Sequence, residues 1–201
     1  MFTGIISHQG RFKGYRRGRA QIAVEAPGLA GKAAPGDSVA VSGVCLTLTG
    51  EDRGALLFDL SKETVAKSKL GSLKPGEILN LELPLTLATP LSGHLVSGHA
   101  DGVGTVSRVT SRPPGKRLAV SFPAALRPYF VPKGSVAVDG VSLTIASLSA
   151  SSFEVELIPT TLSSTNLGGL RPGAAVNLEC DVVGKYVYNW MSQGTHDRRH
   201  H

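Results

Sequence analysis

SGVCLTLTG at residues 42–50 returns as DGVSLTIAS at residues 139–147. In both stretches apolar side chains alternate with small or polar ones, which is typical of a half-buried β-strand. The repeat extends outward, because LGSLKPGEILNLE from Leu70 returns as LGGLRPGAAVNLE from Leu167, and the offset is 97 residues in both cases. The chain is therefore interpreted as a tandem duplication whose halves run through the same order of elements.

Short strands dominate each half. Clusters of Gly, Pro and Ser separate further strand-like runs, which lie at 54–61, 77–83, 104–110, 117–122, 152–158 and 174–183. About six short antiparallel strands per half can close into a small barrel that leaves no exposed sheet edge. We therefore expect a mainly all-β fold, with two similar six-stranded antiparallel Greek-key barrels in tandem and a short C-terminal helix.

The expected organisation has four parts. The first barrel covers residues 1–87, the second covers 88–184, a helix covers 185–195 and a polar tail covers 196–201. The boundary is placed in LPLTLATPLSG at 83–93, whose two prolines break strand pairing. The C-terminal helix has an apolar face, formed by Val183, Tyr186, Val187 and Trp190. Because two closed barrels leave this face little to cover, we expect it to pack against its own copies in an oligomer.

Composition excludes several classes of protein. No run approaches the roughly 18 apolar residues that a membrane span requires, and the start MFTGII has no signal-peptide pattern, so a cytoplasmic location is expected. Two cysteines are too few for a disulfide framework. His94 and His99 lie close together without an acidic or cysteine cluster, so no metal site is expected. The net charge of +6 permits nucleic-acid binding, but scattered basic residues without an aromatic platform favour a solvated surface.

The two copies share some polar positions and differ at others. The shared pairs are Gly4 and Gly98, Gly43 and Gly140, Thr47 and Thr144, and Thr64 and Thr161. For the glycines a conserved turn explains the match best, whereas the threonines fit a turn or a ligand with a planar hydrogen-bonding edge equally well. The differing pairs are Cys45 and Ser142, Ser42 and Asp139, Gly36 and Lys133, and Ile5 and His99. Each difference alone has an ordinary explanation, but together they favour two related pockets of unlike polarity.

Six motifs resemble the riboflavin synthase family. They are MFTGII at 1–6, GVCLTLT at 43–49, GHLVSGHADG at 93–102, DGVSLTIA at 139–146, LIPTTL at 157–162 and NLECDVVGKYV at 177–187. The resemblance implies that two molecules of 6,7-dimethyl-8-ribityllumazine exchange a four-carbon unit. The products are riboflavin and 5-amino-6-ribitylamino-2,4(1H,3H)-pyrimidinedione, and no external cofactor is required. It also implies a homotrimer in which the N-terminal barrel of one subunit faces the C-terminal barrel of its neighbour.

The resemblance places the chemistry at six residues, which are His99, Ser142, Cys45, Asp139, Lys133 and Thr144. The 7-methyl group of the lumazine must lose a proton, and His99 is the candidate to move it because imidazole works near neutral pH. Ser142 or Cys45 adds to a ring carbon or holds a bound nucleophile, and the sequence leaves that division open. Lys133 and Asp139 are expected to orient and polarise the ring, and Thr144 to support Ser142.

The resemblance also implies one set of ligand contacts in each barrel. The first set is Gly4, Ile5, Ile6, Cys45, Leu46, Thr47, Asp59, Leu60, Ser61, Lys62, Glu63 and Thr64. The second is Gly98, His99, Ala100, Lys133, Val141, Ser142, Leu143, Glu156, Leu157, Ile158, Pro159, Thr160 and Thr161. Phe2 and Thr3 are expected to border the site. The alternative is an antenna-type protein of the same fold that binds lumazine or flavin without turnover, and the joint presence of Cys45, His99 and Ser142 favours the enzyme.

Overall fold

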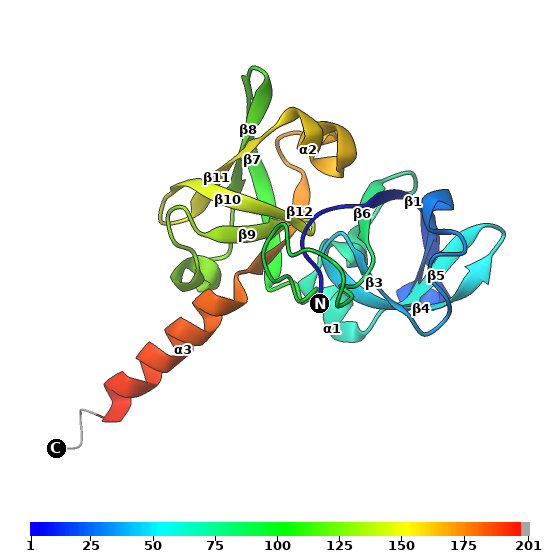
Figure 1. The fold of residues 1–201 in the computed structure, drawn as a ribbon, viewed down its shortest axis with the longest axis horizontal. Coiled ribbons are helices and arrows are strands. Elements are labelled where there is room, and N and C mark those ends of the chain that lie inside the picture. The colour runs from blue at the N-terminus through cyan, green and yellow to red at the C-terminus, as the bar shows by residue number, and fades with distance from the viewer. Residues whose placement is uncertain (198–201) are drawn as a thin grey trace.

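The computed structural model describes residues 1–197 and places two β-barrels next to each other, with a helix leading away from the second (Figure 1). The first barrel contains β1 (His8–Arg16), β2 (Gln21–Glu25), β3 (Ser38–Val41), β4 (Val44–Asp52), β5 (Ala55–Asp59) and β6 (Ile78–Glu82). The second contains β7 (Gly102–Arg112), β8 (Gly115–Ser121), β9 (Ser135–Val138), β10 (Val141–Leu148), β11 (Ser152–Leu157) and β12 (Ala175–Cys180).

Both sheets close on themselves with the same topology. The first barrel has the strand order β1-β2-β5-β4-β3-β6, and the second, followed from β7, has the order β7-β8-β11-β10-β9-β12. Every pairing is antiparallel, and in both barrels the third and fourth strands pair with the register expected from the repeat, such as Ala40 with Cys45 and Ala137 with Ser142. The predicted fold class, two six-stranded antiparallel barrels with a C-terminal helix, is confirmed.

The α-helices are α1 (Lys62–Lys67), α2 (Pro159–Ser164) and α3 (Val182–Asp197), and the 3-10 helices are η1 (Arg17–Arg19), η2 (Pro27–Leu29), η3 (Lys69–Ser72), η4 (Ala124–Tyr129) and η5 (Asn166–Gly169). Three pairs of helical segments occupy equivalent places in the two halves, namely α1 and α2, η3 and η5, and η2 and η4, whereas η1 and α3 have no counterpart. The Ser61 hydroxyl accepts the Thr64 N–H and caps α1, while a proline begins α2. None of the helices in the described part is long and apolar enough to cross a membrane.

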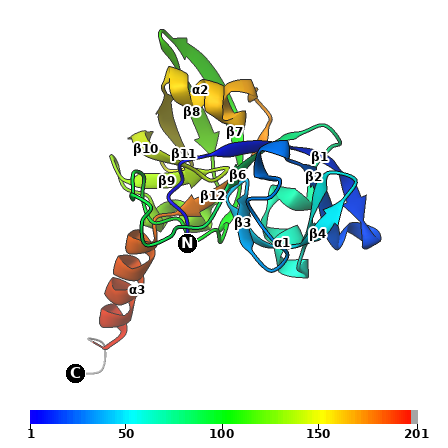
Figure 2. The ribbon, with the colours of Figure 1, turned by 45° about the vertical axis from the view of Figure 1, so that its right-hand side comes forward.

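The C-terminal helix α3 is longer than expected. It begins three residues before the predicted start at 185 and continues through Asp197. The first two residues of the predicted polar tail, 196 and 197, therefore belong to this helix, and the rest of that tail, 198–201, lies outside the described residues. In both ribbon views most of its length stands clear of the two barrels (Figures 1 and 2).

Each barrel encloses its own hydrophobic core. In β4 the side chains of Val44, Leu46 and Leu48 are buried in that core. Alternation along the strand therefore turns Cys45 and Thr47 to the outside of the barrel. The same alternation in β10 buries Val141 and Ile145. The reactive positions of both copies consequently lie on the outer surfaces of the barrels.

The barrels meet where two equivalent turns cross. Ser42 and Asp139 both have left-handed backbones, with φ of 44° and 47°, and each precedes a glycine with positive φ. A Cβ on Gly43 would lie 2.6 Å from the backbone nitrogen of Gly140, so no side chain fits at the crossing. The turns that begin β4 and β10 are thus in backbone contact.

A buried ion pair fixes this crossing. Lys69 of the first half places its Nζ 2.6 Å from Oδ2 of Asp139 in the second, and the side chains are 3% and 0% exposed. The Asp139 carboxylate also accepts the Asn166 side-chain amide at 2.7 Å and the Asn177 backbone N–H at 2.8 Å. Asn80 donates to the backbone oxygen of Asp139 at 2.9 Å. Both charges are therefore buried but paired, as burial requires.

Replacing Lys69 with methionine tests this ion pair. The substitution preserves most of the side-chain volume but leaves the Asp139 charge buried without a cation, so the free energy of unfolding should fall by about 3–5 kcal/mol. Chemical denaturation measures the loss. The control is Lys13→Met, which breaks the exposed pair with Glu25, whose side chains are 51% and 49% exposed, and should cost below about 1 kcal/mol. Equal losses in the two variants would contradict a special role for the buried pair.

Candidate active site

Each barrel is preceded by a segment that crosses to the other barrel. The N-terminal crossing segment, residues 2–6, lies on β10, where the Ser142 N–H donates to the Gly4 carbonyl at 2.8 Å. The central crossing segment, residues 93–100, lies on β4, where the Cys45 N–H donates to the Gly98 carbonyl at 2.7 Å. The prediction placed residues 4–6 in the pocket of the first barrel and residues 98–100 in that of the second. In the structure residues 98–100 line the pocket of the first barrel, whereas residues 4–6 lie against the second barrel and belong to neither pocket lining.

The two crossing segments hold each other in place. Phe2 and Val96 exchange backbone hydrogen bonds of 2.8 and 3.1 Å, and both side chains are buried in a small cluster with Ala40 and Ala137, one residue from each barrel. Phe2 is fully buried and Thr3 is 4% exposed. These two residues, expected to border the site, therefore anchor the crossing segments.

Gly4 and Gly98 allow the close approach of each segment. Their φ angles are +75° and +82°, and a Cβ on either would lie 2.6 Å from the Cβ of Ser142 or Cys45 respectively. Glycine is required here by both backbone conformation and space. This supports the interpretation that Gly4 and Gly98 match because the backbone requires glycine there.

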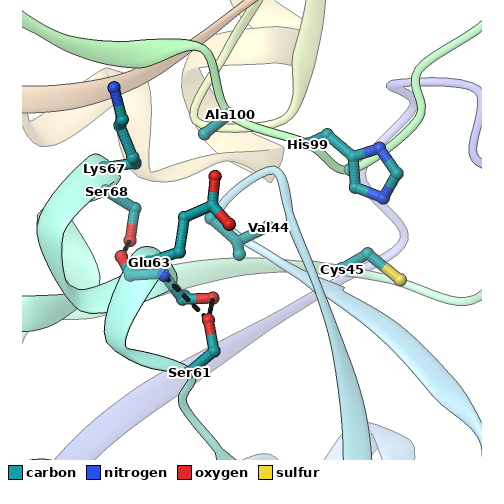
Figure 3. Close-up of a pocket in the computed structure, with 10 residues that line it drawn as sticks. Val44, Cys45, Ser61, Glu63, Lys67, Ser68, His99 and Ala100 are labelled. Atoms are coloured by element: carbon teal, nitrogen blue, oxygen red, sulfur yellow. Dashed lines mark hydrogen bonds between the residues drawn. The ribbon is translucent and has the colours of Figure 1, made fainter.

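A first pocket of about 380 Å³ opens beside Cys45. It is lined by Val44, Cys45, Ser61, Glu63, Thr64, Lys67, Ser68, Gly98, His99 and Ala100. Figure 3 shows the side chains of Cys45 and His99 at one side of this pocket and Lys67 at the other, with Glu63 between them. The barrel supplies the thiol and the α1 residues, whereas the crossing segment supplies the imidazole.

Not every predicted contact of the first barrel reaches this pocket. Leu46 and Leu60 are 4% and 7% exposed and belong to the barrel core, because alternation along the chain points them inward. Asp59 is exposed and accepts the Gln21 side-chain amide at 2.7 Å. Thr47 and Lys62 are exposed outside the first pocket's lining.

A second pocket of about 350 Å³ lies at the equivalent place on the second barrel. It is lined by Lys133, Ser142, Leu143, Thr144, Ala146, Glu156, Ile158 and Thr161, of which all but Ala146 were expected. Val141 and Leu157 are buried in the core, and Pro159 and Thr160 are exposed outside this lining. Lys133 has a left-handed backbone with φ of 65°. The second pocket thus combines a hydroxyl, a cation and an acid.

Asp139 lies in neither lining. Its side chain is fully buried and its carboxylate is occupied by Lys69, Asn166 and Asn177. The expectation that Asp139 contacts the ligand therefore requires correction, because the acid belongs to the contact between the barrels.

His94 is a site residue that the sequence did not single out except as a possible metal ligand. Its Nδ1 lies 2.7 Å from the Ser142 hydroxyl, and its Nε2 is buried without a hydrogen-bond partner among residues 1–197. Burial lowers the pKa of His94, although Asp181 and Glu179 oppose this effect, so the imidazole is favoured in its neutral form. A neutral imidazole can accept the proton of a hydroxyl at this distance.

The two thiols have different surroundings. Both cysteines are free; Cys45 is half-buried at the first pocket and Cys180 is 1% exposed. Burial raises the pKa of Cys180, which keeps it a protonated core residue. No cluster of three His, Cys, Asp or Glu side chains suited to a metal ion occurs within the described part of the chain. The available chemistry is that of Cys45, His99, Ser142, His94 and Lys133.

Comparison with known proteins agrees with this duplicated architecture. The family model of the lumazine binding domain matches twice, at residues 3–84 and 97–181. The chain is therefore a tandem lumazine-binding-domain protein. Structures of LumP complexed with 6,7-dimethyl-8-(1'-D-ribityl) lumazine and with riboflavin share the fold, with TM-scores of 0.79 and 0.82 at 22% identity. They cover 89% and 90% of this chain, and 98% and 99% of the LumP chains.

Sequence similarity defines the family more narrowly. The chain is 41% identical over 200 residues to the riboflavin synthase of Mycobacterium tuberculosis, a match that covers 95% of this chain and 98% of the relative. It is 34% identical to that of Bacillus subtilis, with 98% and 93% covered. The protein belongs to the riboflavin synthase family.

Substituting Gly98 with alanine tests the contact between the central crossing segment and Cys45. The left-handed backbone costs any alanine about 1–2 kcal/mol, and the clash with Cys45 should add about 1–3 kcal/mol. Because the segment must move, the Cys45 thiol should react faster with a thiol reagent. The control is Gly54→Ala, which has a similar φ of +79° and open space around it. The control should leave thiol reactivity unchanged, and if Gly98→Ala also left it unchanged, the segment would not shield Cys45.

Proposed function

We propose that the protein is a riboflavin synthase that converts two molecules of 6,7-dimethyl-8-ribityllumazine into riboflavin and 5-amino-6-ribitylamino-2,4(1H,3H)-pyrimidinedione. The proposal rests above all on nearly full-length similarity to riboflavin synthases. Two further observations support it: the pockets are equivalent in construction, and they carry different reactive groups, a thiol with an imidazole in one and a hydroxyl with an ammonium group in the other. Two identical substrates that take unlike roles require such a pair.

The proposed division of labour follows the linings. His99, exposed at the first pocket, takes the proton from the 7-methyl group of one lumazine. Ser142, whose hydroxyl is held by His94, or Cys45 adds to a ring carbon. Lys133 stabilises negative charge on the ring, and Thr144 lines the same pocket as Ser142. Since donor and acceptor are the same compound, no external cofactor enters the reaction.

Three copies of the chain are proposed to assemble through α3. Its apolar side chains are exposed in the single chain, with Tyr186 at 74% and Trp190 at 80%. The start of the helix lies near the first pocket: a cavity of about 590 Å³ is lined both by Tyr186 of the helix and by His99, which also lines the first pocket. A neighbour packed on α3 would cover apolar surface and bring its second pocket towards this first pocket.

A cytoplasmic location is also proposed, in keeping with two free cysteines.

The competing function is a lumazine- or flavin-binding protein without turnover. The LumP structures hold 6,7-dimethyl-8-(1'-D-ribityl) lumazine or riboflavin, but at 22% identity the likeness to them extends only to the fold. Such a protein needs the pockets and does not need Cys45, His99 and Ser142 together.

Incubation with 6,7-dimethyl-8-ribityllumazine alone tests the proposal. One riboflavin should form for every two lumazines consumed. Ser142→Ala should lower kcat by about 10²-fold or more, because a nucleophile or its proton transfer is lost, while riboflavin binding persists. Ser147→Ala, on the same strand and outside the pocket lining, is the matched control. Tight binding of lumazine without riboflavin formation by the unmodified protein would refute the enzyme and support the binding protein.

Charge placed on α3 tests the proposed trimer. Trp190→Glu should convert a trimer into single chains in light scattering, because a carboxylate would be buried in an apolar interface. Riboflavin formation should fall with it if the site spans two subunits. Asn189→Glu adds the same charge beside the apolar stripe and should leave the trimer intact. An unmodified protein that runs as a single chain would overturn this part of the proposal.

A further inference from the structure

Two buried carboxylates stand at equivalent positions beside the crossing segments. Glu82 ends β6, Glu179 is in β12, and the two are 97 residues apart. They are 5% and 3% exposed, and neither lines the first or second pocket. A buried carboxylate is expensive unless donors surround it, so their partners indicate what they do.

Glu179 accepts four hydrogen bonds from three consecutive residues. Its Oε1 accepts the backbone N–H and the hydroxyl of Ser97 at 2.6 and 2.7 Å. Its Oε2 accepts the backbone N–H of Gly98 at 2.9 Å and that of His99 at 3.1 Å. Both oxygens are thus engaged, and all donors belong to the central crossing segment. Hydrogen bonds to an ionised acceptor are stronger than neutral ones.

Glu82 repeats this arrangement on the N-terminal crossing segment. Its Oε1 accepts the backbone N–H and the hydroxyl of Thr3, both at 2.7 Å, and its Oε2 accepts the Gly4 N–H at 3.1 Å. The Thr3 hydroxyl in turn accepts the Ile5 N–H at 3.0 Å. In the other copy the Ser97 hydroxyl accepts the His99 N–H at 3.2 Å. The residue two positions after the hydroxyl residue is therefore held in each segment, and it is Ile5 in one copy and His99 in the other.

We propose that Glu179 is a positioning residue for the reaction, because it fixes the backbone of residues 97–99 and so aims the His99 imidazole into the first pocket. Glu82 fixes residues 3–5 against Ser142 in the same way. Each carboxylate belongs to one barrel and holds a segment against a strand of the other, β10 for Glu82 and β4 for Glu179. The inference rests on the role of His99 in the proposed function.

A glutamine cannot replace this acceptor. It has nearly the same shape, but only its oxygen accepts hydrogen bonds, and its NH₂ group would face the N–H groups of Gly98 and His99. The donors converging on Oε2 would then lose their acceptor. The substitution Glu179→Gln therefore loosens residues 98 and 99 without removing a side chain from the pocket, and Glu82→Gln loosens residue 4.

The pair of variants separates positioning of His99 from general loss of structure. Both should melt several degrees lower than the unmodified protein, with faster amide hydrogen exchange at residues 97–100 in Glu179→Gln and at residues 3–6 in Glu82→Gln. Glu179→Gln should lower kcat by about ten- to a hundredfold with less than about a threefold change in KM. The decisive readout is a double-mutant cycle with His99→Ala. In that background Glu179→Gln should lower kcat by less than about twofold, whereas Glu82→Gln should lower it by the same factor as in the unmodified background.

Each outcome decides the proposal. A full additional loss from Glu179→Gln in the His99→Ala background would overturn it, because the carboxylate would then act independently of His99. Unchanged amide exchange at residues 97–100 would overturn it too, and this measurement needs no turnover. If the unmodified protein forms no riboflavin, the proposed function fails, while the exchange data still decide whether Glu179 fixes the segment.

Discussion

The contact between Gly43 and Gly140 is the constraint on which the rest of the structure depends. No side chain fits between these two turns, and the buried pair of Lys69 and Asp139 holds them together. The strand β4 reaches Cys45 two residues after the first turn glycine, and β10 reaches Ser142 two residues after the second. The positions of both reactive residues are therefore set by the contact between the barrels as much as by the barrels themselves.

The duplication is symmetric in backbone and asymmetric in charge. At the differing positions compared above, three ionisable groups occur only in the second copy, and in the structure they lie in three different places. Asp139 enters the contact between the barrels, where its partner Lys69 stands opposite Asn166 in the repeat, so the charge is balanced across the contact. Lys133 remains in the second pocket and His99 reaches the first. Unequal pockets thus arise without any change of fold.

The repeat and the strand alternation predicted the two barrels and their equivalent strands. The family resemblance supplied seven of the eight residues that line the second pocket, but it assigned to the first barrel only four of the ten that line the first pocket. The repeat did not predict which barrel each leading segment covers, because an alignment of repeats gives equivalence and not position in space. Leu46 was included among the contacts as a neighbour of Cys45, although alternation points the two side chains in opposite directions. Asp139 and His94 were misjudged for a related reason. Asp139 is buried in the contact between the barrels, and His94 contacts Ser142 although the two are 48 residues apart in sequence. Neither contact between distant residues can be read from the local pattern.

The exchange of the crossing segments gives one short stretch a role at both pockets. The central crossing segment pairs with the N-terminal one through Val96, places His94 against Ser142 of the second barrel, and after the turn at Gly98 places His99 in the first pocket. An uncrossed arrangement would leave each pocket with groups from its own half alone. Because the segment crosses, a single motif supplies His99 to the first pocket and a histidine partner, His94, to Ser142 of the second, and the carboxylate of Glu179 fixes the end that carries His99. The chemistry of the two pockets is therefore coupled through shared backbone, and a displacement of this segment must alter both.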